Sequence, residues 1–168
     1  MWDTVHKLFE ILSISTSISP FRTSISCLPF NDGSLTTNRT RLSDKSICPQ
    51  LNRRGWKNLE EKIRDWAVAD SAIIIICGPI IDKPSKTIGK NKVAVPERFF
   101  KVILSPFVKP ARGIGFLFNN RQAVEPLSTY AVSIDSIEKL THMDFFSPLP
   151  DEIENAVEAN ADYYQWPR

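Results

Sequence analysis

The fold of this 168-residue chain is decided by one stretch, Cys48-Pro49-Gln50-Leu51-Asn52-Arg53-Arg54-Gly55-Trp56-Lys57-Asn58-Leu59-Glu60-Glu61-Lys62-Ile63-Arg64-Asp65-Trp66-Ala67. Its apolar residues recur at spacings of three and four, the repeat of one buried helix face. They are Trp56, Leu59, Ile63, Trp66 and Ala67. Pro49 disfavours a helical conformation at Cys48, and Asn52 stands where a cap residue accepts the first free backbone N–H groups. We therefore predict an amphipathic helix that begins at Asn52.

The polar residues of this helix have two interpretations. Glu60 and Arg64 are four residues apart and project from the same side. An amide oxygen at the helix entry, with a carboxylate and a guanidinium further along, could hold a hydrated metal ion beside a phosphate. The same residues also fit an ordinary surface helix with an Asn cap, because Glu–Arg pairs at this spacing are common and individually weak.

The composition indicates one soluble domain. Apolar residues make up 42% of the chain and charged residues 24%, which is enough apolar material for one core. Twelve prolines against six glycines argue against a simple helical bundle. No apolar run is long enough to span a bilayer, so we predict no membrane span. Acidic residues interrupt the apolar N-terminus, which makes it a poor signal peptide and neither supports nor excludes export. Three cysteines without metal spacing indicate buried free thiols: Cys27, Cys48 and Cys77.

The net charge of +2 hides an uneven distribution. Residues 82–112 contain eight Lys/Arg and two acids, whereas residues 135–168 contain eight acids and two bases. A basic segment suits a polyanionic partner, since neutralising phosphates releases counterions and gives non-specific affinity. It also fits a solvated surface that happens to be basic. The lysines that favour a polyanion lie close together: Lys83, Lys86, Lys90 and Lys92.

The order of the remaining segments predicts an α+β fold with a mainly antiparallel sheet flanked by helices. Residues 71–77 form a continuous β-branched run before Gly78-Pro79, typical of a strand buried on both faces. Further strands are predicted over 93–104, with a break near Pro96, and over 113–118. Ser133 is a suitable N-cap for a helix over 134–140. A last acidic helix is expected over 151–160, with Ile153 and Val157 on its inner side.

Residues 1–46 are less informative. They are rich in Ser and Thr, and residues 14–19 alternate apolar and polar side chains like an exposed strand. We expect this segment to have little order, or at most one or two edge strands.

The central helix resembles the metal-binding helix of the DNA/RNA non-specific endonucleases, the ββα-metal or His-Me finger nucleases. The resemblance rests on Pro49-Gln50, Leu51-Asn52, Gly55-Trp56, Leu59-Glu60 and Arg64. Downstream segments also resemble that family: Ile76–Ile80, Ala94–Pro96, Phe99–Val102, Val132–Thr141 and Leu149-Pro150. The resemblance covers residues 47–168, which implies a partial ββα-metal nuclease-like domain over 47–168, with its N-terminal part incomplete, preceded by a poorly specified Ser/Thr-rich segment, residues 1–46.

The resemblance implies a site with one divalent cation, usually Mg²⁺, and a DNA or RNA phosphate backbone as substrate. Asn52 would be the direct metal ligand, a hard oxygen donor suited to Mg²⁺. Glu60 would orient metal-bound waters, and Arg64 would contact the scissile phosphate.

One part of the family site is missing from the sequence. The family's general-base His lies in an Asp-Arg-Gly-His motif upstream of the helix, and the chain contains no such motif. Its two histidines, His6 and His142, have other surroundings, and the connection from Gln50 to Asn52 is a few residues shorter than usual. Two hypotheses follow. Either the chain is an endonuclease-family domain with impaired phosphodiester hydrolysis, or it is a non-catalytic nucleic-acid-binding or structural remnant.

Overall fold

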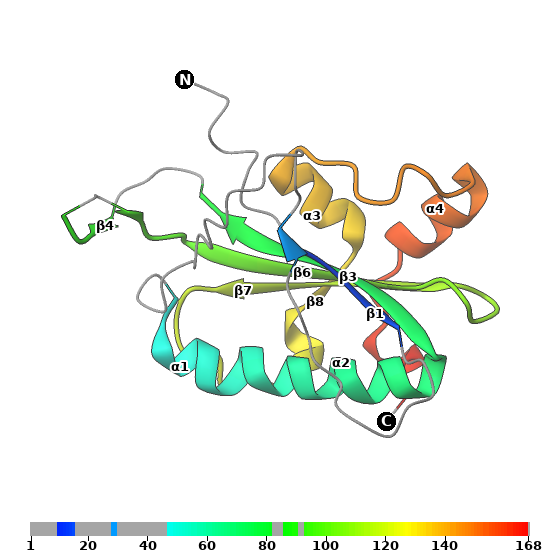
Figure 1. Ribbon diagram of the computed structural model, residues 1–168, viewed down its shortest axis with the longest axis horizontal. Helices are drawn as coiled ribbons and strands as arrows, with labels where there is room; N and C mark the ends of the chain where they lie inside the picture. Colours follow the sequence, from blue (N-terminus) through cyan, green and yellow to red (C-terminus); the bar gives the residue numbers. More distant parts are fainter. Residues whose placement is uncertain (1–9, 16–27, 30–46, 82–85, 91–92, 168) are drawn as a thin grey trace.

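The computed structural model describes residues 10–15, 28–29, 47–81, 86–90 and 93–167. Helix α2 covers one face of an antiparallel sheet, and α3 and α4 cover the other (Figure 1). This arrangement confirms the predicted α+β class. The helices are α1 (Pro49–Leu51), η2 (Asn52–Trp56), α2 (Lys57–Asp70), η3 (Leu127–Tyr130), α3 (Ile134–Thr141), α4 (Asp151–Glu158) and η4 (Tyr163–Gln165).

Every strand pair in the described residues is antiparallel. The main sheet has the order β2-β1-β3-β6-β7-β8, and β4 and β5 form a separate two-stranded sheet. The strands are β1 (Glu10–Ser15), β2 (Leu28–Pro29), β3 (Ala72–Ile80), β4 (Thr87–Ile88), β5 (Val93–Ala94), β6 (Arg98–Ser105), β7 (Arg112–Asn119) and β8 (Ala131–Val132). The predicted break near Pro96 therefore separates two strands, β5 and β6, that belong to different sheets.

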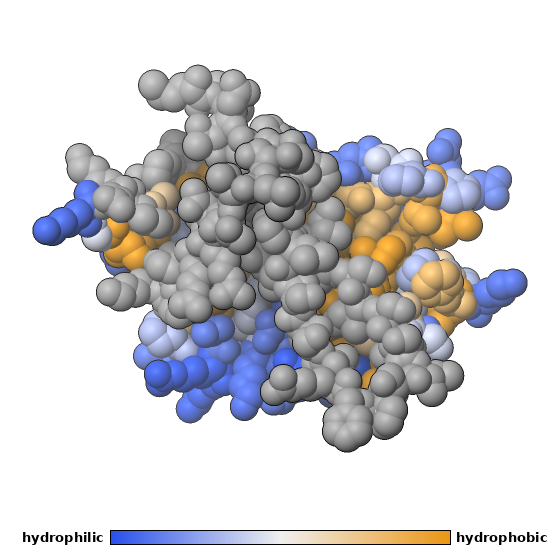
Figure 2. Space-filling model, viewed as in Figure 1, coloured by the Kyte–Doolittle hydropathy of each residue, from blue (hydrophilic) through white to orange (hydrophobic). Residues whose placement is uncertain are grey.

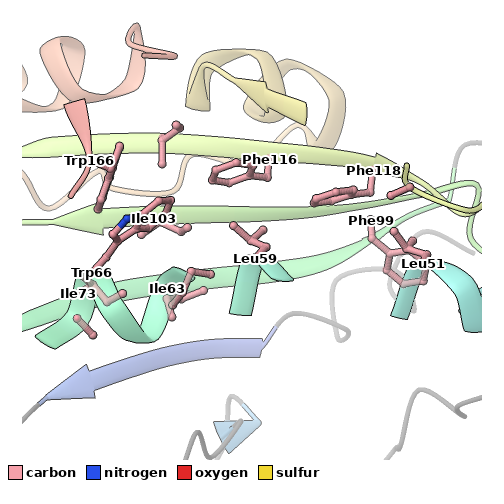
Figure 3. Close-up of a cluster of buried hydrophobic side chains, with 14 residues drawn as sticks. Leu51, Leu59, Ile63, Trp66, Ile73, Phe99, Ile103, Phe116, Phe118 and Trp166 are labelled. Carbon is pink, nitrogen blue, oxygen red and sulfur yellow. The ribbon is translucent and has the colours of Figure 1, made fainter. Parts of the chain in front are cut away.

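The central strands are buried on both faces because side chains alternate between two cores. Phe99 and Ile103 of β6 pack in the cluster under α2, whereas Phe100 and Val102 pack in the cluster under α3 and α4. Figure 3 shows the first cluster, in which Leu59, Ile63 and Trp66 of α2 point toward the sheet. Four of the five predicted inner residues of the helix are buried, and Trp56 is half-buried.

Strand β3 is longer than the sequence predicted. It continues through Gly78 and Pro79, which pair with β6, rather than ending before them. Proline has no N–H to donate to a ladder. Among the described residues, β3 pairs with β1 from Ala72 to Cys77, and Pro79 pairs with Phe99 of β6.

Strand β1 corrects the expectation for the N-terminal segment. Residues 10–15 form an inner strand between β2 and β3, not an edge strand. Residues 16–19 of the predicted alternation lie outside the described residues, as does the rest of 1–46 apart from Leu28–Pro29 of β2.

The C-terminal helices follow the prediction with one exception. The Ser133 side chain accepts the N–H of Ser136 at 3.3 Å and caps α3. In α4 Val157 is buried, but Ile153 is 42% exposed, so the predicted inner side was wrong at Ile153. The helix is only two turns long and packs through its last turn.

Two smaller expectations can also be compared. Cys48 is a free thiol, Cys48 and Cys77 are half-buried rather than fully buried, and Cys27 lies outside the described residues. None of the described helices is both long and apolar enough to cross a membrane.

Candidate active site

The helix of the candidate site begins earlier than the sequence predicted. Helical backbone runs from Pro49 to Asp70, through α1, one π-helical segment (η2) and α2. Cys48 is extended (φ −58°, ψ 123°), as expected before proline, and Pro49 occupies the first helical position, where its missing N–H costs nothing. Asn52 is therefore not an N-cap: its backbone is helical (φ −59°, ψ −44°), and its N–H donates to the Cys48 carbonyl at 3.0 Å.

The side chain of Asn52 is exposed on the first turns of this helix. None of the hydrogen bonds among the described residues engages its amide group, so the oxygen is open to solvent or to a hydrated ion. The short connection after Gln50 explains the change of role, because the helix starts at Pro49 and incorporates Asn52 instead of being capped by it.

Gly55 brings the π-helical segment close to the sheet. A Cβ atom there would lie 2.5 Å from the Ala123 Cβ and 3.3 Å from the Phe118 ring. Only glycine allows this approach, which seats Trp56 edge-on against Phe99 and Phe118, with centroids 6.0 Å apart in both pairs. The helix start is thus fixed on β6 and β7 by close packing.

Glu60 is held by a residue that sequence reasoning did not select. Lys101 of β6 is 2% exposed, and its Nζ lies 3.4 Å from Glu60 Oε1 and 4.2 Å from the centre of the Trp56 ring. The pair Glu60–Arg64 is absent among the described residues, and Glu60 is linked to the sheet instead. A signal existed in the sequence, because one lysine within the apolar run Phe99–Leu104 requires a buried partner.

Arg64 is exposed on the outer side of α2. Figure 2 shows hydrophilic residues along this side, at the bottom of the view. The exposed cations of the helix and the turn before it are Arg53, Arg54, Lys57 and Arg64. Exposed acids offset part of this charge, since Lys57 pairs with Glu61 at 3.6 Å and Asp65 is also exposed. The basic character suited to phosphate contacts is therefore greatest at the first turns, where Arg53 and Arg54 lie.

Hydrogen bonds through Asn120 also link the start of the helix to the residues that follow β7 and precede β6. The Asn120 side-chain oxygen accepts the Cys48 N–H at 2.6 Å, and its amide nitrogen donates to the Pro96 carbonyl at 2.9 Å. An open depression of about 320 Å³ lies beside this junction, lined by Glu97, Asn119, Asn120 and Arg121. The predicted site residues do not line it.

The structure places His142 at the C-terminal end of α3. It ends α3 in the left-handed conformation (φ 55°), and its N–H donates to the Glu138 carbonyl at 2.7 Å. It follows α3, which lies on the opposite face of the sheet from α2 (Figure 1). His6 lies outside the described residues.

Comparison with known proteins identifies the class. The chain matches the DNA/RNA non-specific endonuclease family over residues 32–152, which is most of its length. The protein belongs to this family of nucleases, and the resemblance seen in the central helix is confirmed.

Individual relatives are similar over part of their length. A nuclease of Nostoc sp. is 28% identical over 127 residues, 68% of this chain and 44% of that protein. Human mitochondrial endonuclease G is 32% identical over 113 residues, 58% of this chain and 37% of that protein. A crystal structure of an EndoG/EndoGI complex aligns with a TM-score of 0.54 at 25% identity, over 60% of this chain and 46% of that one. The chain thus spans less than half the length of these relatives.

Proposed function

We propose that residues 47–168 form a metal-dependent, sequence-non-specific DNA/RNA endonuclease domain whose phosphodiester hydrolysis is lost or severely reduced. The observation that carries the proposal is the helix Pro49–Asp70, which exposes Asn52 while Lys101 holds Glu60 against the sheet. In this assignment Asn52 is the metal ligand, Glu60 orients the metal-bound waters, and Arg64 contacts the scissile phosphate.

The donor atoms of the helix fit Mg²⁺. This ion prefers hard oxygen ligands and usually retains several waters. Eight residues separate Asn52 from Glu60, about 12 Å along a helix axis, so one ion cannot be bound directly by both. Glu60 can therefore act only through the waters, as a group that orients them. When bound, the ion would polarise the phosphate and stabilise the leaving oxygen.

The reduced rate follows from the absent base. The chain has no Asp-Arg-Gly-His motif, and His142 lies at the end of a helix on the other face of the sheet. General-base catalysis contributes about 10²–10⁴-fold in rate. We therefore expect Mg²⁺-dependent cleavage to be at least that far below the rate of a relative with the intact motif.

A plasmid-nicking assay with Mg²⁺ tests this proposal. Wild type is compared with Asn52→Ala and with Asn58→Ala, which removes an equally exposed amide from the same helix. The expected result is at most trace nicking by wild type, lost in Asn52→Ala and kept in Asn58→Ala. Nicking at the rate of an intact relative would overturn the proposed impairment, and measurable wild-type nicking that both variants keep equally would overturn the metal role of Asn52.

The second candidate function is non-catalytic nucleic-acid binding. The β4–β5 hairpin favours it, because Lys86 and Lys90 are exposed at the same end of the long axis as α1 (Figure 1). Gly89 lies in its turn with φ 74°, and Lys83 and Lys92 lie outside the described residues. Removing each phosphate-binding lysine should reduce the slope of log affinity against log salt by about one. Unchanged anisotropy titrations of labelled DNA with Lys86→Ala/Lys90→Ala would leave only a structural role for the hairpin.

A further inference from the structure

The acidic C-terminal third of the chain collects its carboxylates between α3 and α4. Oxygens of Asp135, Glu138 and Glu158 lie within 4.8 Å of one another. A second group, Asp144, Glu154 and Glu158, meets the same limit. Glu158 belongs to both groups, so one side chain joins all five carboxylates.

Glu158 is the unusual member of this cluster. It is 7% exposed, and its Oε1 is buried without a hydrogen-bond partner among the described residues. The close approach of α4 to β7 explains the burial, since a Cβ on Gly113 would lie 2.6 Å from the Val157 carbonyl oxygen. A buried carboxylate without a partner is costly, so this oxygen lacks the group that would compensate its charge.

In the part of the chain that the structure describes, the surroundings supply further negative charge and no cation paired with it. None of the ion pairs formed among the described residues includes any of the five acids. Burial, followed by the charges of Glu138 and Glu154, raises the pKa of Glu158 to about 7. One Glu138 oxygen accepts the Phe145 N–H at 2.9 Å, which orders the connection that carries Asp144.

We propose that Asp135, Glu138 and Glu158 bind a structural Ca²⁺ ion that links α3 to α4, with Asp144 and Glu154 grouped on the same Glu158 side chain beside it. Ca²⁺ takes six to eight oxygen ligands at about 2.4 Å, so ligand atoms on opposite sides of the ion are about 4.8 Å apart. The carboxylate oxygens of each group fall within that limit. Mg²⁺ requires shorter distances and stricter octahedral geometry, so a crowded set of carboxylates favours the larger ion.

This ion would be separate from the cation proposed for Asn52. Asn52 begins the helix on one face of the sheet, whereas α3 and α4 cover the other face (Figure 1). The role of the second ion is stability rather than phosphate chemistry. It would replace the repulsion between two short helices with shared ligands and hold the end of α4 against β7.

Thermal unfolding of chelator-treated protein with added Ca²⁺ tests the proposal. At a Ca²⁺ concentration 100 times its Kd, the Tm of wild type should rise by about 5–10 °C. Glu158→Gln should abolish the rise, whereas Glu152→Gln, an exposed acid of α4 outside both groups, should keep it. Asn52→Ala should also keep it. Calorimetric titration of wild type with Ca²⁺ should give one site per chain.

Three results would overturn the proposal: no Ca²⁺-dependent rise in wild type, an unchanged rise in Glu158→Gln, or, in Asn52→Ala, which lacks the ligand proposed for Mg²⁺, an equal rise with Mg²⁺ at the same concentration. Should Glu158→Gln fail to fold, Asp135→Asn removes a half-buried ligand of the same cluster and must also weaken Ca²⁺ binding. Full Ca²⁺ affinity in Asp135→Asn would count against the site as well.

Discussion

Replacing Arg112 should destabilise the protein more than replacing any surface cation. Arg112 Nη2 lies 2.6 Å from Asp70 Oδ1, and Nη1 donates to the Gln165 carbonyl at 2.7 Å. Its guanidinium carbon also lies 5.3 Å from the centre of the Trp166 ring. This one side chain therefore joins the end of α2, the start of β7 and the C-terminal turn.

The magnitude follows from the burial of the partner. Asp70 is 7% exposed, so Arg112→Met leaves a carboxylate charge in the interior without compensation. Breaking such a pair typically costs about 3–5 kcal/mol. For a chain of this size, 1 kcal/mol shifts the Tm by about 2–4 °C, so the Tm should fall by roughly 6–20 °C. Asp70→Asn in the same chain removes the stranded charge and should restore part of the loss.

Urea denaturation followed by tryptophan fluorescence measures the effect, since Trp66 and Trp166 lie 4.7 Å apart beside the pair. The matched control is Lys57→Met, which breaks an exposed pair with Glu61 whose side chains are 63% and 54% exposed. That change should cost less than about 0.5 kcal/mol. Equal losses in Arg112→Met and Lys57→Met, or no recovery with Asp70→Asn, would refute the reasoning.

Three further changes have expected outcomes. Gly55→Ala should lower the free energy of unfolding by about 1–3 kcal/mol, because its Cβ meets Ala123, and Ala123→Gly should rescue it in urea denaturation. Lys101→Ala should cost about 2–3 kcal/mol through lost packing and the lost cation–π contact, and Lys101→Met, which keeps the stem, should cost less by the same assay. The folded protein binds the Glu158 proton more tightly, because the pKa of Glu158 is about 7 against its ordinary value of 4.5. Without divalent cations, the free energy of unfolding should therefore fall by up to about 3 kcal/mol as the pH rises from 4.5 to about 7. Glu158→Gln should show a flatter profile in pH-dependent melts.

The sequence correctly predicted those helices and strands whose side-chain pattern fits only one kind of secondary structure. The spacing of Leu59, Ile63 and Trp66 allows only a helix with one buried face, and Ser133 before Ile134 fits only a cap. Strand positions followed from short β-branched runs for the same reason. These signals are local, and the long-range contacts agree with them.

The errors arose where distant residues decided the outcome. Asn52 has the residue type of a cap, but the proline at the first helical position three residues earlier starts the helix first. Glu60 has a suitable partner on its own helix, Arg64. It pairs instead with Lys101 on β6, because a buried ammonium group is costly without an opposite charge. Both outcomes depend on which segments meet in the fold. The spacing of residues along one helix carries no information about those contacts. The roles of Asn52, Glu60 and Arg64 stay predictions until they are assayed.

The π-helical segment Asn52–Trp56 has a consequence for how this helix tolerates changes in length. In an α-helix, residues four apart drift about 40° around the axis at each step, so a stripe with that spacing soon leaves the buried face. The wider turn rotates less per residue and reverses part of the drift, which keeps Leu51, Gly55, Leu59 and Ile63 all buried. Deleting one residue within Asn52–Trp56 should therefore convert this turn to an ordinary α-helical one, with Leu59 and Ile63 kept on the buried face.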